Sequence, residues 1–324
     1  MGGAPDQDGA VTGYDVVGDV HGHADRLEAL LRSLGYRKRD GAYRHRGRRA
    51  VFVGDLIDRH PQQRRTVDVV RRMIDAGSAQ MVLGNHEFNA VAFGLAREDG
   101  TYGRPHTDKN LRQHRAFLDE VGFGTALHCE LMAWFCETPM WLELDGLRVV
   151  HACWSSRHIE LLAGALDEDH TLSPSTIEAA TTQGTDLHEA VEIVLKGPEL
   201  DLDGIWYRDQ GGHRRTAARL RWWDSSANTL QRAALIPPGT VLHDGRRGDV
   251  PVVELPDRAL AATVSPYSGP VPVLFGHYWW QRGTAEPVNP MATCLDFSVA
   301  AGGDLAAYRF DGEPHLDPAN LVWG

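Results

Sequence analysis

Short apolar runs alternate with helix-like segments in the first third of the chain. Three runs, which end at Val17, Val53 and Leu83, have the length and composition of buried strands. Between them, residues 24–34 and 61–76 place apolar side chains three and four positions apart, as in an amphipathic helix. Strand, helix, strand, helix, strand predicts two βαβ units and therefore parallel pairing.

The rest of the chain repeats both patterns. Residues 141–144 and 147–151, joined by Asp-Gly, predict a hairpin. Further strands are predicted at 272–275, 292–299 and 305–310 and a strand-like segment at 217–223, whereas Pro and Gly between 237 and 272 predict mostly loop. Helical patterns occur at residues 109–121, 126–137, 156–166, 175–180 and 186–196.

These elements predict one elaborated domain over residues 14–312. A disordered leader is expected at residues 1–13 and a tail at 313–324. Helical insertions are expected at about 88–138 and 155–235. The first insertion contains more helix than a crossover between strands needs, so we expect it to form a cap over a functional site.

Polar side chains that bind metals follow each of the first three predicted strands. In an α/β sheet, ligands gather at the carboxyl ends of strands, and a glycine there lets the backbone turn sharply. One such motif alone is more often a turn or a satisfied polar group, but three in order point to a shared site. The motifs are Gly18-Asp19-Val20-His21-Gly22, Gly54-Asp55-Leu56-Ile57-Asp58-Arg59 and Gly84-Asn85-His86-Glu87.

This series resembles the calcineurin-like metallophosphoesterase superfamily, and within it the bacterial type of the phosphoprotein-phosphatase branch. Val149-Val150-His151-Ala152 and Leu274-Phe275-Gly276-His277 resemble the later strand-end motifs of that branch. Cys294-Leu295-Asp296 is similar to the strand that follows in diadenosine tetraphosphatases. The resemblance covers residues 14 to about 310 and implies a four-layer αββα sandwich with two central mixed sheets.

The resemblance also implies a site with two divalent metal ions. Manganese is the first expectation, with iron, zinc, nickel or cobalt as alternatives, because the predicted donors suit such ions. A hydroxide that bridges the ions would be the nucleophile. Asp19 and His21 would hold the first ion, Asp55 would bridge, and the second would be held by Asn85, His151 and His277.

Three further residues receive roles from the same resemblance. His86 would donate a proton to the leaving oxygen, with Asp58 orienting it. Arg59 would bind phosphoryl oxygens through its guanidinium fork. Relatives use a second cation on the phosphate, and spacing alone does not separate the candidates Lys196, Arg208 and Arg221.

The chain departs from the resemblance at the mouth of the expected site. His60 and Pro61 replace the glycine that usually follows Asp-Arg, which adds bulk there. Tyr278 and Trp279 follow His277, where many phosphodiesterases have a second metal-binding histidine. The missing histidine favours the phosphatase branch. The aromatic residues that follow His277 either line a base-stacking wall or, as we expect of the tryptophans, pack in the core.

Composition narrows the class of partner. A net charge of −11 excludes a general nucleic-acid binder, which needs a broad basic surface. The basic hairpin predicted around Asp40-Gly41 is expected to be a solvated flank rather than a nucleotide grip. No stretch reaches the roughly 20 apolar residues of a membrane span. Four cysteines without a disulfide framework suit a reducing cytoplasm.

The leading interpretation is a hydrolase of phosphomonoesters or phosphoanhydrides. Its substrate would be a phosphoprotein, a nucleoside polyphosphate or a small phosphorylated metabolite. One alternative is a phosphodiesterase, for example of cyclic nucleotides, on the same site. A second is a non-catalytic sensor of metal or phosphate, which the presence of both His86 and Asp58 disfavours because a binder needs no leaving-group acid.

Overall fold

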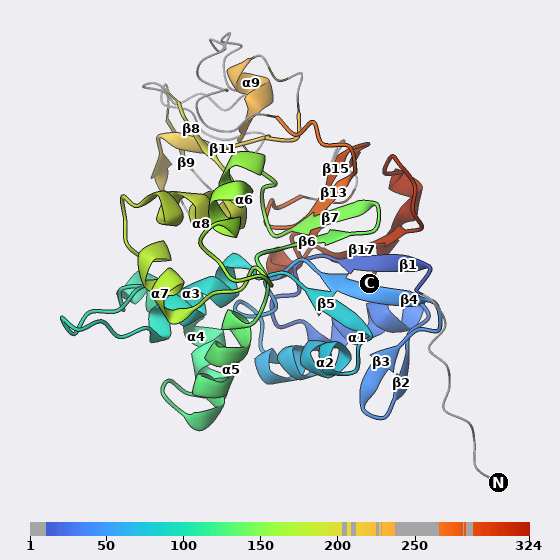
Figure 1. Cartoon of the computed structure of the whole chain (residues 1–324), viewed down its shortest axis with the longest axis horizontal. Helices are drawn as coiled ribbons and strands as arrows, with labels where there is room; N and C mark the ends of the chain where they lie inside the picture. Colours follow the sequence, from blue (N-terminus) through green and yellow to red (C-terminus); the bar gives the residue numbers. More distant parts are fainter. Residues whose placement is uncertain are drawn as a thin grey trace.

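Two mixed β-sheets form the centre of the computed structural model of the chain (Figure 1). The structure describes residues 11–202, 206–208, 212–224, 227, 229–236, 266–280, 282 and 288–324. Most of the predicted loop at 237–272 and most of the predicted leader lie outside these residues.

The first sheet is mixed and has β1 near its middle. Strand β4 pairs with β1 in parallel, β5 pairs with β4 in parallel, and β17 pairs with β1 antiparallel. Its strands are β1 (Gly13–Val17), β4 (Arg48–Phe52), β5 (Ala79–Met81), β16 (Asp296–Phe297), β17 (Asp304–Phe310) and β18 (Leu321–Trp323). Residues 313–324, predicted as a tail, therefore supply β18, which pairs with β17.

The second sheet is also mixed. Strand β13 pairs in parallel with β7 and β15, whereas β6 and β14 pair antiparallel with their neighbours. Its strands are β6 (Trp141–Leu144), β7 (Leu147–Val150), β13 (Val273–Phe275), β14 (Val288–Asn289) and β15 (Ala292–Cys294). The hairpin predicted at 141–151 is the pair β6 and β7.

The two sheets pack face to face through alternate strand residues. Successive side chains of a strand point to opposite faces, so every second residue can enter the layer between the sheets. One buried cluster combines side chains of both sheets, including Val16, Val51, Val149 and Leu274. The residues next to them in the chain belong to a larger cluster that contains the helices. This confirms the predicted four-layer arrangement.

Helices cover the outer faces. Helices α1 and α2 lie along the first sheet, and α6 and α8 pack together on the side of the second (Figure 1). The predicted insertion at 88–138 contains most of α3 together with α4 and α5. The helices are α1 (Ala24–Ser33), α2 (Gln63–Asp75), α3 (Asn85–Gly94), α4 (Asp108–Val121), α5 (Ala126–Cys136), α6 (Ser156–Ala163), α7 (Pro174–Ala180), α8 (Asp186–Lys196) and α9 (Leu230–Ala233).

Small elements complete the described fold. The hairpin predicted around Asp40-Gly41 is present, and its first strand is exposed along its whole length. The segment predicted as a strand at 217–223 forms β11 in a separate small sheet. These strands are β2 (Arg37–Arg39), β3 (Ala42–Arg44), β8 (Glu199–Asp201), β9 (Tyr207–Arg208), β10 (Arg214–Arg215), β11 (Ala217–Leu220) and β12 (Ala234–Leu235); short 3₁₀ turns occur at Val299–Ala301 and Pro318–Asn320.

Helix α2 begins two residues later than the sequence predicts. Pro61 was expected in its first turn, but the helix begins at Gln63 after Gln62, whose φ is 80°. The carboxylate of Glu120, on α4, accepts hydrogen bonds from the backbone N–H groups of Gln62, Gln63 and Arg64 at 2.7–3.0 Å. A cap supplied by another helix therefore sets this boundary.

Among the described residues, no helix is both long and apolar enough to cross a membrane.

Candidate metal centre

Strand register brings the three N-terminal motifs to one level. Val17 lies opposite Phe52 in the β1–β4 pair, and Phe52 lies opposite Met81 in the β4–β5 pair. The polar residues that follow these strands therefore leave the sheet together. In the second sheet, β7 and β13 run in parallel and deliver His151 and His277. All six predicted ligands are buried where the sheets meet: Asp19, His21, Asp55, Asn85, His151 and His277.

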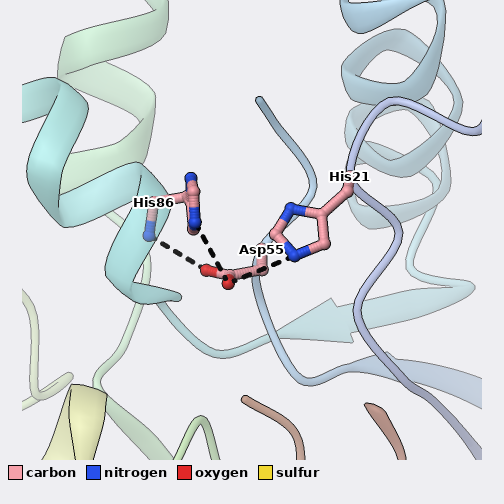
Figure 2. A group of neighbouring side chains, drawn as sticks. All are labelled: His21, Asp55 and His86. Carbon is pink, nitrogen blue, oxygen red and sulfur yellow. Dashed lines mark hydrogen bonds and ion pairs between the residues drawn. The ribbon is translucent and has the colours of Figure 1, made fainter. Parts of the chain in front are cut away.

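Asp55 lies between two groups of possible ligand atoms. The first group is His21, Asp55 and His86; the second is Asp55, His151 and His277; within each group the ligand atoms lie within 4.8 Å of one another. One oxygen, Oδ2, is 3.7 Å from His21 Nε2, and the other, Oδ1, is 3.4 Å from His151 Nε2. Figure 2 shows His21 and His86 converging on this carboxylate. The two oxygens of Asp55 thus face different histidines, as a bridging ligand requires.

The other two predicted ligands complete the groups. Asp19 Oδ2 lies 4.0 Å from His21 Nε2 and also accepts a hydrogen bond from the backbone N–H of His277 at 3.1 Å. Asn85 Oδ1 lies 3.0 Å from His151 Nε2. Backbone carbonyls hold the far sides of two imidazoles: Nδ1 of His21 is 3.0 Å from Ile57 O, and Nδ1 of His151 is 2.7 Å from Val53 O. The Nε2 atoms are thereby left to face the centre.

The backbone around the centre is held in unusual conformations. Five non-glycine residues there have positive φ, a region that costs about 1–3 kcal/mol per residue and clusters at functional sites. They are His21, Asp55, Asp58, Arg59 and His277, with φ of 47–74°. Gly84 permits a close approach, because a Cβ there would lie 2.2 Å from the backbone nitrogen of Asp55.

Burial favours the neutral form of the three histidines that are predicted as metal ligands. It lowers the pKa of His21 to about 4 and lowers the pKa of His151 as well. For His277, burial and then the charge of Arg219 lower the pKa well below its usual value. A neutral imidazole is the form that binds a metal, so these three side chains are ready to act as ligands at neutral pH.

Three buried acidic side chains, Asp19, Asp55 and Asp296, interact with one another at the centre. Burial, together with the charges of Asp296 and Asp55, raises the pKa of Asp19 well above its usual value. Burial and the charge of Asp55 also raise the pKa of Asp296 to about 7, against the hydrogen bond from the Ser298 backbone. Buried like charges of this kind need cations beside them.

The residues fit two divalent ions. Carboxylate and amide oxygens with neutral imidazoles suit manganese, iron or zinc. Within the described part of the chain, the buried Nε2 of His277 has no hydrogen-bond partner, as expected of an atom reserved for a ligand. His277 belongs to the second group of possible ligands, together with Asp55 and His151.

His86 and Asp58 form a buried pair beside the centre. His86 Nδ1 lies 2.5 Å from Asp58 Oδ2, and its Nε2 lies 3.9 Å from Asp55 Oδ2. Burial opposes the charged form of His86, but the charges of Asp55 and Asp58 outweigh it and raise its pKa. The geometry would allow Nε2 of His86 to contact either a metal ion or the leaving oxygen. The hydrogen bond to Asp58 agrees with the predicted role of His86 as the proton donor.

Comparisons with known proteins agree with this geometry. A family model described as calcineurin-like phosphoesterase matches residues 14–148. This N-terminal part of the chain is therefore similar to the calcineurin-like phosphoesterases. A "Bis(5'-nucleosyl)-tetraphosphatase, symmetrical" of Vibrio cholerae is 25% identical over 323 residues, which cover 94% of this chain and 98% of that protein.

Two other comparisons concern a partial match in sequence and a match in structure. An asymmetrical bis(5'-nucleosyl)-tetraphosphatase of Geobacillus is 33% identical over 140 residues, so the chain matches 55% of that relative's length and 43% of its own. A solved protein serine/threonine phosphatase from Saccharomyces cerevisiae is 14% identical with a TM-score of 0.50, over 97% of this chain and 79% of that one. The latter likeness shows that the chain shares the fold of that phosphatase.

Glu87 supports the candidate metal centre, although we predicted no role for it from the sequence. Its carboxylate is fully buried and accepts hydrogen bonds from the backbone N–H groups of Asp55 and Leu56, both at 2.8 Å, and of Ile57 at 3.3 Å. It therefore holds the loop that carries Asp55. The motif Gly84-Asn85-His86-Glu87 was the available signal, because its last residue stands next to two predicted site residues.

Arg219 is a second residue near the centre that was not predicted from the sequence. Its Nη1 donates to the carbonyl oxygen of His277 at 3.1 Å, and its guanidinium lies 5.6 Å from the ring of Tyr278. Three predicted candidates have other partners. Lys196 pairs with Glu192, Arg208 donates to the carbonyl of Gly212, and Arg221 donates to that of Arg232.

The mouth of the site differs from the expectation at Trp279, which is not packed in the core. His60, expected to add bulk there, stacks on His23 with 3.8 Å between ring centroids. Tyr278 is fully buried and Trp280 is partly buried, as expected for core packing. Trp279 is 43% exposed, and its ring lies 5.8 Å from the guanidinium of Arg59. One aromatic ring thus remains available next to the predicted phosphate-binding arginine.

Proposed function

We propose that this chain is a binuclear-metal phosphatase that hydrolyses phosphomonoesters or phosphoanhydrides. The observation that carries the proposal is the position of Asp55, whose two oxygens face two separate groups of ligands beside the pair formed by His86 and Asp58. Two divalent ions, when bound, supply the nucleophile by lowering the pKa of a water and neutralise charge on the phosphoryl oxygens. Manganese is the first ion to test.

The side chains of the protein perform the proton transfer and the positioning. His86 gives its Nε2 proton to the leaving oxygen as the bond from phosphorus to that oxygen breaks, while the water-derived oxygen forms the new bond to phosphorus. The products are phosphate, or a shorter phosphorylated compound, and the protonated leaving group; His86 then takes a proton from water. Asp58 keeps the imidazole in the orientation that this step needs.

Arg59 is the group that we assign to the phosphoryl oxygens. Its side chain is exposed at the mouth, and its guanidinium can donate two parallel hydrogen bonds to a phosphate. Arg219 is the better candidate for a second cation, because its charge acts on His277 and Asp296. We place it ahead of the three candidates that the sequence suggested.

A nucleoside polyphosphate is the substrate class that we favour. The support is the similarity to proteins named bis(5'-nucleosyl)-tetraphosphatase, together with the exposed ring of Trp279 beside Arg59. A phosphoprotein and a small phosphorylated metabolite are the other candidates. The four free cysteines suit the expected cytoplasmic location.

The test compares a monoester with a diester under one metal condition. With Mn²⁺, the catalytic efficiency should be higher on p-nitrophenyl phosphate than on bis-p-nitrophenyl phosphate, because a monoester presents more oxygens to the metals and Arg59. Diadenosine tetraphosphate and a phosphopeptide then separate the substrate classes. A tenfold preference for the diester, about 1.4 kcal/mol, would replace the phosphatase by the phosphodiesterase. Metal binding without turnover of any substrate would indicate a sensor.

A further inference from the structure

His114 contacts the acid–base pair from outside the strand-end motifs. It lies on α4, in the helical insertion, and is fully buried. Its Nδ1 is 2.8 Å from Asp58 Oδ1, whereas His86 Nδ1 is 2.5 Å from Asp58 Oδ2. Each oxygen of one buried carboxylate therefore faces its own histidine.

This arrangement fixes the orientation of the carboxylate. Asp58 is fully buried, and a carboxylate bound through both oxygens cannot rotate without losing a hydrogen bond. The backbone is fixed as well, since the N–H of Asp58 donates to Gln63 Oε1 at 2.7 Å. Burial alone would raise the pKa of Asp58, but the hydrogen bonds from His114 and then His86 hold it well below its usual value.

The other described contacts of the His114 ring are with aromatic side chains. Phe117 stacks on it with 4.9 Å between centroids, and Phe93 lies at 5.4 Å. Within the described residues, its Nε2 has no hydrogen-bond partner. An unpartnered buried nitrogen opposes folding, so an apolar side chain would suit the helix packing better. The polar ring is explained by the bond to Asp58.

We propose that His114 is a positioning residue that holds Asp58, and through it His86, in the geometry needed for proton donation to the leaving group. The inference rests on the proposed function. It gives the helical insertion a part in positioning the proton donor, in addition to the expected covering of the site.

The first test needs no turnover. In metal-free protein with ¹⁵N-labelled histidine, the Nδ1–H groups of His86 and His114 should give two slowly exchanging, downfield resonances. His114→Phe should remove its own signal and broaden that of His86, while His114→Asn, which keeps an N–H donor, should preserve the signal of His86. His128→Phe is the matched control, because His128 is a second buried histidine of the insertion whose Nε2 lacks a partner among the described residues. It should leave both resonances unchanged.

The second test measures kinetics with Mn²⁺ on phenyl phosphate and p-nitrophenyl phosphate. Loss of a group that orients a reacting side chain costs about 10–100-fold, so His114→Phe should slow phenyl phosphate by at least tenfold. The effect should be smaller on p-nitrophenyl phosphate, whose leaving group needs less proton donation. His114→Asn should recover most of the activity. Adding His114→Phe to His86→Ala should cause no further loss, because both changes remove the same function.

Two results would overturn the proposal. One is an unchanged His86 resonance in His114→Phe. The other is an equal loss on both esters that adds to the loss in His86→Ala, as a purely structural role predicts. If the wild type hydrolyses no phosphate ester yet His114→Phe broadens the His86 signal, the proposed function fails and the positioning contact stands.

Discussion

Removal of the Asp55 side chain should weaken both metal positions at once. Its Oδ2 faces His21 and its Oδ1 faces His151, at 3.7 and 3.4 Å, so Asp55→Ala deletes one ligand from each group. Loss of an outer partner of a metal ligand costs about 10–100-fold in affinity. Loss of the ligand itself should cost at least the upper end of that range, which is about 2.8 kcal/mol for each ion at 1.4 kcal/mol per tenfold.

Variants that remove a predicted ligand from only one of the two groups supply the comparison. His21→Ala should impair the first position and His277→Ala the second, and neither should affect both equally. The assay is Mn²⁺ titration by calorimetry, with elemental analysis of protein freed of metal by a chelator and then reloaded. Wild-type protein should bind up to two ions per chain. The reasoning would be refuted if Asp55→Ala lost only one ion, or if the two histidine variants lost the same one.

Three further changes test separate parts of the site. His86→Ala should retain metal but lose about a hundredfold or more in turnover of esters with poor leaving groups; an equal loss with p-nitrophenyl phosphate would contradict an acid role. Glu87→Gln should lower the free energy of unfolding by about 2 kcal/mol, because a buried backbone donor loses its acceptor; urea denaturation measures this, and an unchanged midpoint would contradict it. Trp279→Ala should lower catalytic efficiency on a dinucleoside polyphosphate about tenfold, the scale of stacking on one base, with little change on glycerol phosphate; equal losses would exclude stacking.

Local sequence patterns predict that the polar residues after β1, β4 and β5 lie close together. Each of Asp19, Asp55 and Asn85 stands within a few residues of an apolar run, and strand register then forces them together. The parallel pairing needed for this follows from helices of adequate length between the strands. His151 and His277 required the resemblance, because nothing in their own segments says which strands lie side by side.

The supporting contacts were beyond sequence reasoning for a different reason. His114 reaches Asp58 across 56 positions, and Glu120 caps α2 across 56–58 positions. Such contacts depend on how α4 docks against α2, which the periodicity of neither helix specifies. Arg219 lies in a segment whose small sheet has no strong pattern, and its approach to His277 is visible only in three dimensions.

The division of the predicted ligands between the two sheets would couple metal occupancy to the cohesion of the whole fold. Asp19, His21, Asp55 and Asn85 follow strands of one sheet, whereas His151 and His277 follow strands of the other. An ion that binds across this boundary stabilises the folded chain by about 2.7 kcal/mol when its free concentration is a hundred times its dissociation constant. Thermal unfolding should therefore shift with metal concentration, and metal starvation should weaken the contact between the sheets as well as the chemistry.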